Sequence, residues 1–388
     1  MIGPESSSPP SRIVGLFPEL LGVGGIQEAG RLTARALSEI AVRHGWSTDF
    51  LGLNDPPGPH SLDVAGGAIP LCGFGRAKIS FVLSAIRSAN SAARDGASLI
   101  LAGHPNLAVP ADLIQRISPR SRVVVMAHGV EVWTPLPSFR RRALLRANLV
   151  VAPSRDTLQK LIDVQGVAPA RAHRLAWPLS ADFLRMADAV SGLPVPPAFP
   201  QGRPIVLTVG RWESSERYKG VDELIHAVPQ LLTAVPGIQL VAIGGGNDLP
   251  RLRHLATNLG LADRVHFLEN LSRGEVAACY SRADIFALPS TGEGFGLVYL
   301  EAMAFSRAVV GVACGGTTDI VEDGVNGLLV PPRDAAALAQ ALGRLLWDES
   351  LRTQLGRRGA EIVRRIYKFD AFRATLETII DGLMLFAD

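Results

Sequence analysis

Short apolar segments alternate with longer amphipathic ones along almost the whole chain, and one proline-rich stretch interrupts this alternation. The short segments have the length of strands and the longer ones that of helices. Strand–helix alternation predicts parallel sheets covered by helices on both faces. The interruption, Ser191–Pro204, contains five prolines in fourteen residues, so it cannot continue a helix or form a central strand. The sequence therefore predicts an α/β protein with two Rossmann-like domains.

The individual elements follow from this pattern. In the first half, the predicted strands are Arg12–Pro18, Thr48–Leu53, Ser98–Ala102, Arg122–His128 and Asn148–Ala152, and the predicted helices are Ile26–Arg43, Lys78–Ala93 and Ser154–Val164. In the second half, the predicted strands are Ile205–Val209, Ile238–Ile243, Arg264–Phe267, Ile285–Leu288, Ala308–Val312 and Gly327–Val330. Helices are expected between these strands, and two more, Ser350–Arg365 and Asp370–Phe386, close the chain.

This order predicts the domain organisation. We expect a first domain over residues 1–190, a linker over 191–204 and a second domain over 205–368. The last helix, 369–388, is expected to return toward the first domain. The cleft between two sheets of this kind is the default place for a ligand.

Composition excludes several classes of protein. The mean hydropathy is positive, at +0.22, which argues against disorder, but the apolar runs are far shorter than the roughly 20 residues of a membrane span. The net charge of +3 is too small to indicate nucleic acid as a partner. Cys72, Cys279 and Cys314 are widely spaced, which argues against disulfides and zinc sites. Met1–Arg12 lacks the pattern of a signal peptide, so a cytoplasmic protein is expected.

The first glycine-rich loop follows the first predicted strand and precedes a helix. Gly24 and Gly25 would let the backbone approach a phosphate at the helix N-terminus. The dinucleotide pattern G-x-G-x-x-G fails, because its last position is Gln27. Three interpretations of this loop remain open: it binds the phosphate of a sugar nucleotide, it binds an NAD cofactor, or it is a tight turn that binds no ligand.

Two cations follow the first strand of the second half. Arg211 comes directly after Gly210, and Lys219 precedes the next helix. An arginine fork and a lysine point charge suit a pyrophosphate. The alternative is that both are solvated surface charges.

The richest motif lies after the strand Ile285–Leu288. A loop carries Glu293, Phe295 and Gly296, and a helix begins near Leu297 and Val298, whose amides can bind a phosphate. Glu301 lies about one turn inside this helix. Two carboxylates in this arrangement can accept hydrogen bonds from sugar hydroxyls, although Glu293 could simply complement the helix dipole.

The stretch Glu293–Glu301 resembles the Glu-x7-Glu signature of retaining family 4 glycosyltransferases, which have the GT-B fold. The motifs GRWESSERYKG, VAIGGGND, VHFLENLSRGEV, ADIFALPS, GTTDIVEDGVNGLLVPP and AHGVEVW resemble the same family. The resemblance covers nearly the whole chain and is densest over about 205–345.

The resemblance implies roles for the second half. Arg211 and Lys219 would bind the pyrophosphate, Glu293 the hydroxyls of the transferred sugar, and Glu301 the ribose. Around the sugar and the phosphate would lie Phe295, Gly296, Leu297 and Val298.

For the first half, the resemblance implies acceptor binding. The Gly25 amide would meet the donor phosphate, and His128 would lie near the reacting sugar carbon. The alternative for His128 is a packed histidine at the end of a strand. In the second half, the resemblance would place the nucleotide base near Phe267–Ser272. In the first half, Leu175–Leu184 departs from the family pattern.

The chain contains no Asp-x-Asp, the usual metal clamp for a nucleotide diphosphate. We therefore expect no metal and no other cofactor, with the leaving diphosphate stabilised by Arg211, Lys219 and helix N-termini. The resemblance implies front-face transfer, in which the leaving phosphate helps to deprotonate the acceptor.

The basic segment with Arg140, Arg141, Arg142 and Arg146 suggests either a solvated helix face or contact with an anionic membrane surface. Together these features predict a transferase that moves a hexose from GDP-mannose or UDP-glucose to a saccharide or lipid-linked saccharide, as in polysaccharide biosynthesis. A nucleotide-sugar epimerase or phosphorylase, and a non-catalytic sugar-nucleotide binder, are the alternatives.

Overall fold

The computed structural model describes residues 12–64, 67–92, 98–201 and 204–385. The chain forms two compact units of α/β structure. The first unit contains residues up to Pro178 and those from Phe369 onward, and the second contains Leu179–Lys368. Most of Met1–Arg12, on which the signal-peptide prediction rests, lies outside the described residues.

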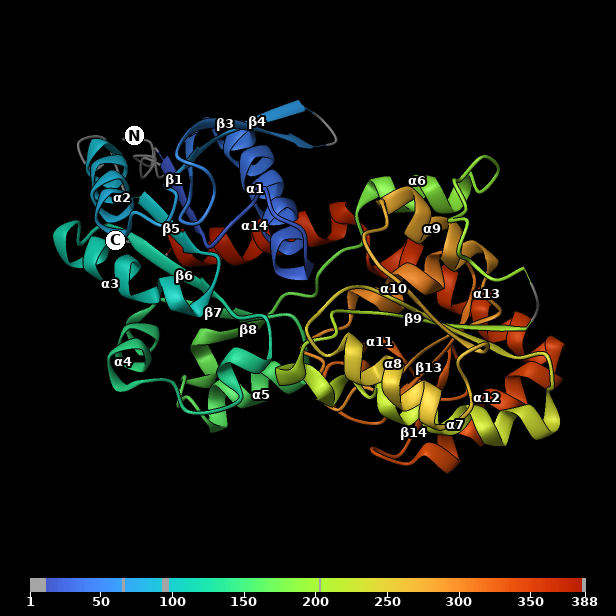
Figure 1. Ribbon diagram of the computed structural model, residues 1–388. Helices are drawn as coiled ribbons and strands as arrows, with labels where there is room; N and C mark the ends of the chain where they lie inside the picture. Colours follow the sequence, from blue (N-terminus) through green and yellow to red (C-terminus); the bar gives the residue numbers. More distant parts are fainter. Residues whose placement is uncertain (1–11, 65–66, 93–97, 202–203, 386–388) are drawn as a thin grey trace, which may run out of the picture. The chain divides into compact units, whose positions relative to one another are not determined.

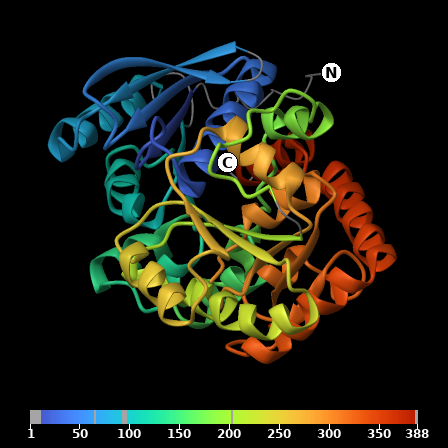
Figure 2. The ribbon, with the colours of Figure 1, turned by 45° about the vertical axis from the view of Figure 1, so that its right-hand side comes forward.

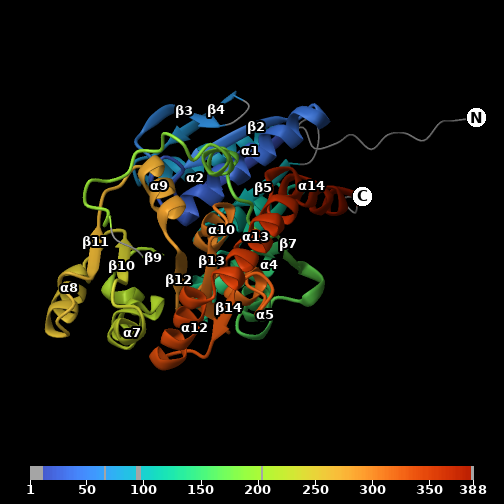
Figure 3. The same cartoon turned by 90° about the vertical axis from the view of Figure 1, so that its right-hand side faces the viewer.

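The first unit is built on an eight-stranded sheet with the order β3-β4-β2-β1-β5-β6-β7-β8. Its strands are β1 (Arg12–Phe17), β2 (Ser47–Gly52), β3 (Gly58–Val64), β4 (Gly67–Gly73), β5 (Ser98–Ala102), β6 (Arg122–Met126), β7 (Leu149–Ala152) and β8 (Ala172–Arg174). All strand pairs are parallel except β3–β4, a hairpin at the edge of the sheet beside β2 (Figure 3). The strands β1, β2, β5, β6 and β7 match the predicted strands within two residues, whereas the hairpin β3–β4 was not predicted.

Helices cover both faces of this sheet. On one face lie α2 (Lys78–Ala92), α3 (Ala108–Ile117), α4 (Ser138–Arg146) and α5 (Arg155–Asp163), which share a core with Val14 and Leu16 of β1. Because side chains alternate along a strand, Ile13 faces the other side, where α1 (Gly25–His44) packs. The C-terminal helix α14 (Phe369–Leu385) packs against α1 (Figure 1).

The second unit is built on a parallel six-stranded sheet with the order β11-β10-β9-β12-β13-β14. Its strands are β9 (Ile205–Val209), β10 (Gln239–Ile243), β11 (Val265–Leu268), β12 (Ile285–Leu288), β13 (Ala308–Val312) and β14 (Leu328–Val330). The main helices are α6 (Ala181–Asp188), α7 (Val221–Ala234), α8 (Leu249–Asn258), α9 (Arg273–Arg282), α10 (Leu297–Ala304), α12 (Ala335–Trp347) and α13 (Glu349–Ile366). Helices α7 and α12 lie side by side over one core of the sheet (Figure 2).

The division between the units differs from the predicted boundary at residue 190. Residues 179–190, which we predicted to belong to the first domain, belong to the second unit. The physical reason is local packing: α6 contacts α9 and α10, and Arg273 donates a hydrogen bond of 2.8 Å to Ser180 Oγ. The Leu179 amide also donates to the Tyr367 carbonyl at 2.8 Å. None of the helices in the described ranges is long and apolar enough to cross a membrane.

Candidate active site

The two charged loops of the second unit follow β9 and β12, which are neighbouring parallel strands. Arg211 comes two residues after β9, and Lys219 ends the short 3-10 helix η4 (Ser214–Lys219). The Thr291 amide, in the loop after β12, donates a hydrogen bond of 2.7 Å to the Tyr218 carbonyl. Gly220 has φ +75° at this contact, and a Cβ there would lie 2.3 Å from the Pro289 carbonyl oxygen. The fold thus joins the two loops at the carboxyl edge of the sheet.

Arg211 and Lys219 share one carboxylate, that of Glu216. The Arg211 guanidinium pairs with both carboxylate oxygens, and Lys219 Nζ lies 3.1 Å from Oε2. Burial alone would raise the pKa of Glu216, but the hydrogen bond from Arg211 and the charge of Lys219 outweigh burial and lower that pKa. Glu216 is therefore ionised, and it was not singled out from the sequence. Its position between the two predicted cations was the available signal.

Glu293 lies in the loop after β12, half-buried and close to these charges. Burial raises the pKa of its carboxyl group, while the charge of Lys219 and a hydrogen bond with Ser290 oppose this effect. The Glu293 carbonyl accepts a hydrogen bond of 2.8 Å from the Gly316 amide. A Cβ on Gly316 would lie 2.5 Å from the Gly294 carbonyl oxygen, so only glycine allows the two backbones to approach this closely. The loop that carries Glu293 is therefore held by backbone packing.

Helix α10 begins directly after this loop, at Leu297. Its N-cap residue, Gly296, has φ +98°, and no side chain caps the helix. The amides of Leu297 and Val298 thus remain uncapped by side chains at the positive end of the helix dipole, as an anion requires. Phe295 is buried beside Tyr367, with ring centroids 5.9 Å apart.

Glu301 lies one turn further along α10. The buried Tyr280 hydroxyl donates a hydrogen bond of 2.9 Å to Glu301 Oε2. Burial, followed by the Glu301 charge, raises the pKa of Tyr280, so this tyrosine stays a donor. The Tyr280 hydroxyl therefore orients the Glu301 carboxylate.

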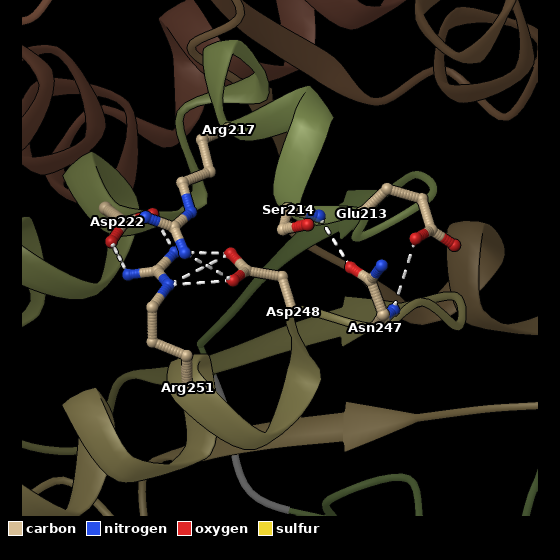
Figure 4. Close-up of polar contacts among 7 residues, drawn as sticks. All are labelled: Glu213, Ser214, Arg217, Asp222, Asn247, Asp248 and Arg251. Carbon is tan, nitrogen blue, oxygen red and sulfur yellow. Dashed lines mark hydrogen bonds and ion pairs between the residues drawn. The ribbon is translucent and has the colours of Figure 1, made fainter.

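A second charged network anchors η4 to the loop after β10 (Figure 4). Arg251 pairs with Asp222 at 2.5 Å and with Asp248 at 2.5 Å, and Arg217 pairs with Asp248 at 3.0 Å. The Ser214 amide donates to Asn247 Oδ1 at 2.7 Å. The network thereby links η4, which carries Lys219, to residues about 30 positions later in the sequence. Sequence reasoning missed this network, because no local pattern shows which surface arginine meets which aspartate.

In the first unit, His128 lies two residues after β6 in an aromatic stack. Its ring lies between His104, at 5.6 Å, and Trp177, at 5.4 Å between centroids. Its Nε2 lies 2.7 Å from the Gly103 carbonyl, which can only accept, so Nε2 carries the proton. Burial lowers the pKa of His128, and burial followed by the His128 charge lowers the pKa of His104 to about 4. Both rings are neutral at pH 7.

Gly24 and Gly25 lie at the N-terminus of α1, at the carboxyl end of β1. Gly24 has φ +148°, and a Cβ on Gly25 would meet open space. The buried Asp55 carboxylate holds the preceding loop, accepting from the amides of Leu20 at 2.9 Å and Leu21 at 2.8 Å. Asp49, in β2, pairs with Arg12 at 2.7 Å and so is not free to bind a ribose. Asp55 was not recognised from the sequence, because nothing local distinguishes it from a loop carboxylate.

The predicted site residues thus fall into two groups. The second unit brings Arg211, Lys219 and the Glu293 loop together, with Glu301 further along α10. The first unit places Gly24, Gly25 and His128 at the carboxyl ends of β1 and β6 of its own sheet. In the part of the chain that the structure describes, no cluster of three or more His, Cys, Asp or Glu residues could hold a metal ion.

Comparison with known proteins decides the family. The profile of "Glycosyl transferases group 1" matches residues 193–362. The GDP-mannose-dependent alpha-(1-6)-phosphatidylinositol monomannoside mannosyltransferase of Mycolicibacterium smegmatis is 32% identical, with 71% of this chain and 74% of the relative aligned. The chain belongs to the group 1 glycosyltransferases. The family predicted from the Glu293–Glu301 stretch is confirmed, and so is the enzyme class.

Further comparisons agree with this group 1 glycosyltransferase assignment. D-inositol 3-phosphate glycosyltransferase of Acidothermus cellulolyticus is 32% identical over 64% of this chain and 58% of the relative. Among solved structures, sucrose-phosphate synthase of Thermosynechococcus elongatus has a TM-score of 0.72 at 22% identity, covering 96% of this chain and 99% of that one. Anabaena HepE with UDP has a TM-score of 0.70 at 18% identity, covering 96% and 100%. These likenesses confirm the predicted GT-B fold.

Proposed function

We propose that this glycosyltransferase moves a hexose, with retention, from a nucleotide diphosphate sugar to a saccharide or lipid-linked saccharide. The observation that supports this proposal is the convergence of Arg211, Lys219 and the Glu293 loop after β9 and β12. In this proposal the two cations bind the pyrophosphate, Glu293 binds the transferred sugar and Glu301 binds the ribose.

The same groups supply the chemistry. As the bond to the sugar breaks, negative charge grows on the diphosphate, and preorganised cations and helix amides stabilise that charge. Arg211, Lys219 and the N-terminus of α10 would do so without a metal. Glu293, whose pKa is raised by burial, would hold a sugar hydroxyl rather than attack the sugar. The leaving phosphate would assist deprotonation of the acceptor.

For the first unit, we propose that the Gly25 amide contacts the donor phosphate and that His128 contacts the sugar. Its neutral ring keeps the proton on Nε2 for the Gly103 carbonyl, which leaves Nδ1 as the unprotonated nitrogen. Such a nitrogen can accept a hydrogen bond from a hydroxyl but adds no charge.

The donor is GDP-mannose or UDP-glucose, and we favour GDP-mannose because the Mycolicibacterium relative is named as GDP-mannose-dependent. A thermal-shift panel of GDP, UDP, ADP and CDP tests the base, since a ligand stabilises by RT ln(1 + [L]/Kd). GDP should give the largest shift. A panel in which no nucleoside diphosphate raises the melting temperature would contradict the proposed function.

We also propose that the acceptor is reached at an anionic membrane surface, through α3 and α4. Val109, Leu113 and Ile117 form a partly exposed apolar stripe on α3. Helix α4, which packs on α3, carries the exposed Phe139 and the basic residues Arg140, Arg141, Arg142 and Arg146. Exposed apolar and cationic side chains on two neighbouring helices suit anionic lipid.

Vesicle co-sedimentation tests this surface. The enzyme should sediment with phosphatidylglycerol vesicles and not with phosphatidylcholine vesicles. Replacing Arg142 and Arg146 by Ser should release it, whereas replacing Arg357 and Arg358, which are also exposed, on α13 should not. Equal sedimentation of all three proteins would contradict the proposed surface.

A further inference from the structure

We propose that Glu216 is a resident counter-anion, which occupies the pyrophosphate-binding cations in the empty enzyme and must yield Arg211 to the donor. This inference rests on the proposed function of Arg211 and Lys219. It assigns Glu216 a tuning role: the carboxylate weakens nucleoside diphosphate binding and so speeds product release.

Arg211 and Lys219 share the same carboxylate. Both cations pair with the Glu216 carboxylate, Arg211 through both of its oxygens and Lys219 through Oε2 at 3.1 Å. A carboxylate presents two oxygens to these donors in the way that a phosphate would. Without a ligand, Arg211 and Lys219 are therefore already paired with an anion. The single negative charge of Glu216 neutralises half of their combined charge of +2.

The three charged side chains differ in their exposure to solvent. The side chain of Glu216 is 13% exposed and that of Lys219 is 17% exposed, whereas that of Arg211 is 67% exposed. A long, exposed arginine can turn from one acceptor to another without any change in the backbone. Arg211 is therefore the group that would exchange partners, while Glu216 and Lys219 stay together.

The segment that carries Glu216, η4, is anchored on two sides. On one side, the Arg217–Asp248 pair and the Ser214–Asn247 hydrogen bond tie η4 to the loop after β10 (Figure 4). On the other side, Tyr218 accepts from the Thr291 amide. Glu216 thus cannot withdraw from the site as a flexible loop would, and the donor must compete with it.

The energetic consequence has a definite sign. A diphosphate carries more negative charge than one carboxylate, so it displaces Glu216 from Arg211, but the free energy of the lost ion pair is subtracted from binding. The Glu216 charge also repels the diphosphate at short range. Removing this charge should tighten binding. A residue that only positions the cations would behave in the opposite way, since its removal would loosen them.

The experiment is calorimetric titration of wild type and Glu216→Gln with GDP and UDP, and with the matching nucleosides. We expect Glu216→Gln to bind the preferred diphosphate about three- to tenfold more tightly and the nucleoside unchanged. Glu216→Ser is the second neutral variant, used if the first fails to fold, and should shift affinity in the same direction.

Glu213→Gln is the matched control. It removes the same formal charge three residues earlier, from a side chain that contacts the Asn247 amide at 3.4 Å. Diphosphate affinity should change by less than about twofold. Weaker or unchanged diphosphate binding in Glu216→Gln would overturn the counter-anion role. If Arg211→Ala and Lys219→Ala also left diphosphate affinity unchanged, the proposed clamp itself would have failed, which separates the two ideas.

Discussion

The carboxyl edges of the two sheets carry opposite chemistry. In the first unit, the edge presents glycine backbone at Gly24 and Gly25 and the neutral rings of His104 and His128. In the second unit, the corresponding edge presents Arg211, Lys219, Glu216 and Glu293, all within one electrostatic cluster. The second edge therefore presents paired charges, whereas the two histidine rings at the first edge carry none, although Glu131 and Arg140 lie close enough to influence the pKa of His104.

The physical origin of this contrast is burial. His128 lies in an aromatic stack, where desolvation lowers its pKa and keeps it uncharged. At the second edge, Arg211 and Lys219 both lie within ion-pair distance of Glu216, so the Glu216 carboxylate stays ionised although it is partly buried. Variants at both edges test this contrast.

Loss of the Glu293 carboxylate should have the largest effect. We expect Glu293→Ala to lower kcat about 10²- to 10³-fold, because a group placed on the reacting sugar is lost. Affinity for the plain nucleoside diphosphate should stay within about twofold, because that ligand carries no sugar. Steady-state kinetics and calorimetry measure the two quantities. Glu349→Ala, at an 84% exposed position in the same unit, is the control.

The neutral edge should show itself in the pH dependence of stability. The pKa of His104 is about 4 in the fold, below its ordinary value of 6.5, so the unfolded chain takes up a proton first. Stability should therefore be full above about pH 6.5 and should fall as the pH drops toward 4, by about 3 kcal/mol from this group.

The measurement is urea denaturation of wild type and His104→Asn between pH 7 and pH 4. In wild type, the Asn106 amide donates a hydrogen bond of 3.0 Å to His104 Nδ1. The side-chain oxygen of an asparagine at position 104 can accept the same hydrogen bond. The variant should lose less stability than wild type over this range. Identical pH profiles would show that the neutral histidine pair does not control stability.

The cation pair should give the next largest effect. Arg211→Ala and Lys219→Ala should each weaken nucleoside diphosphate binding about 10- to 100-fold, the range expected for a charge-assisted contact. Nucleoside binding should change little. Arg358→Ala, which removes an exposed cation on α13, is the control. Equal losses for nucleoside and diphosphate would show that the pair is no phosphate clamp.

Glu301 should affect the nucleoside as well as the diphosphate. Glu301→Ala should cost about 1–3 kcal/mol in affinity for both nucleoside and diphosphate, since a ribose hydroxyl would lose its acceptor. Tyr280→Phe should act in the same direction but less, because Tyr280 only orients the carboxylate. If Glu293→Ala reduced diphosphate affinity as much as Glu301→Ala, the proposed division between sugar and ribose would be wrong.

The sequence predicted the regular part of this molecule well, because local periodicity determines it. The strands Ile205–Val209, Ile285–Leu288 and Ala308–Val312 were predicted with the bounds observed. The hairpin β3–β4 was missed, since both of its strands contain glycine and proline, which disfavour a strand prediction. Helix α4 was identified only as a basic segment, because its four arginines obscure an apolar face.

The sequence allowed prediction of those site residues that lie in recognisable sequence motifs. Arg211, Lys219 and Glu293 stand in recognisable loops after strands, and the structure brings them together. Glu216, Asp55 and His104 act through partners distant in sequence or placed by loop geometry, so no spacing rule reveals them. Residues 179–190 were assigned to the wrong unit because the proline-rich stretch marks a break in secondary structure, whereas the change of unit occurs earlier, before α6.

The smallest expected effect concerns metal. If the second edge supplies enough positive charge by itself, EDTA should leave transfer activity unchanged within about twofold, because Arg211, Lys219 and the N-terminus of α10 stabilise the leaving diphosphate. Activity is measured on dialysed enzyme with EDTA, and again after adding Mg²⁺ or Mn²⁺. Lys219→Ala sharpens the test: a divalent ion that bridged the diphosphate would partly rescue this variant, whereas a metal-free site would gain nothing. Abolition of wild-type activity by EDTA, with recovery on adding metal, would mean that the cationic edge is not sufficient and that the contrast between the two edges overstates what the second unit does alone.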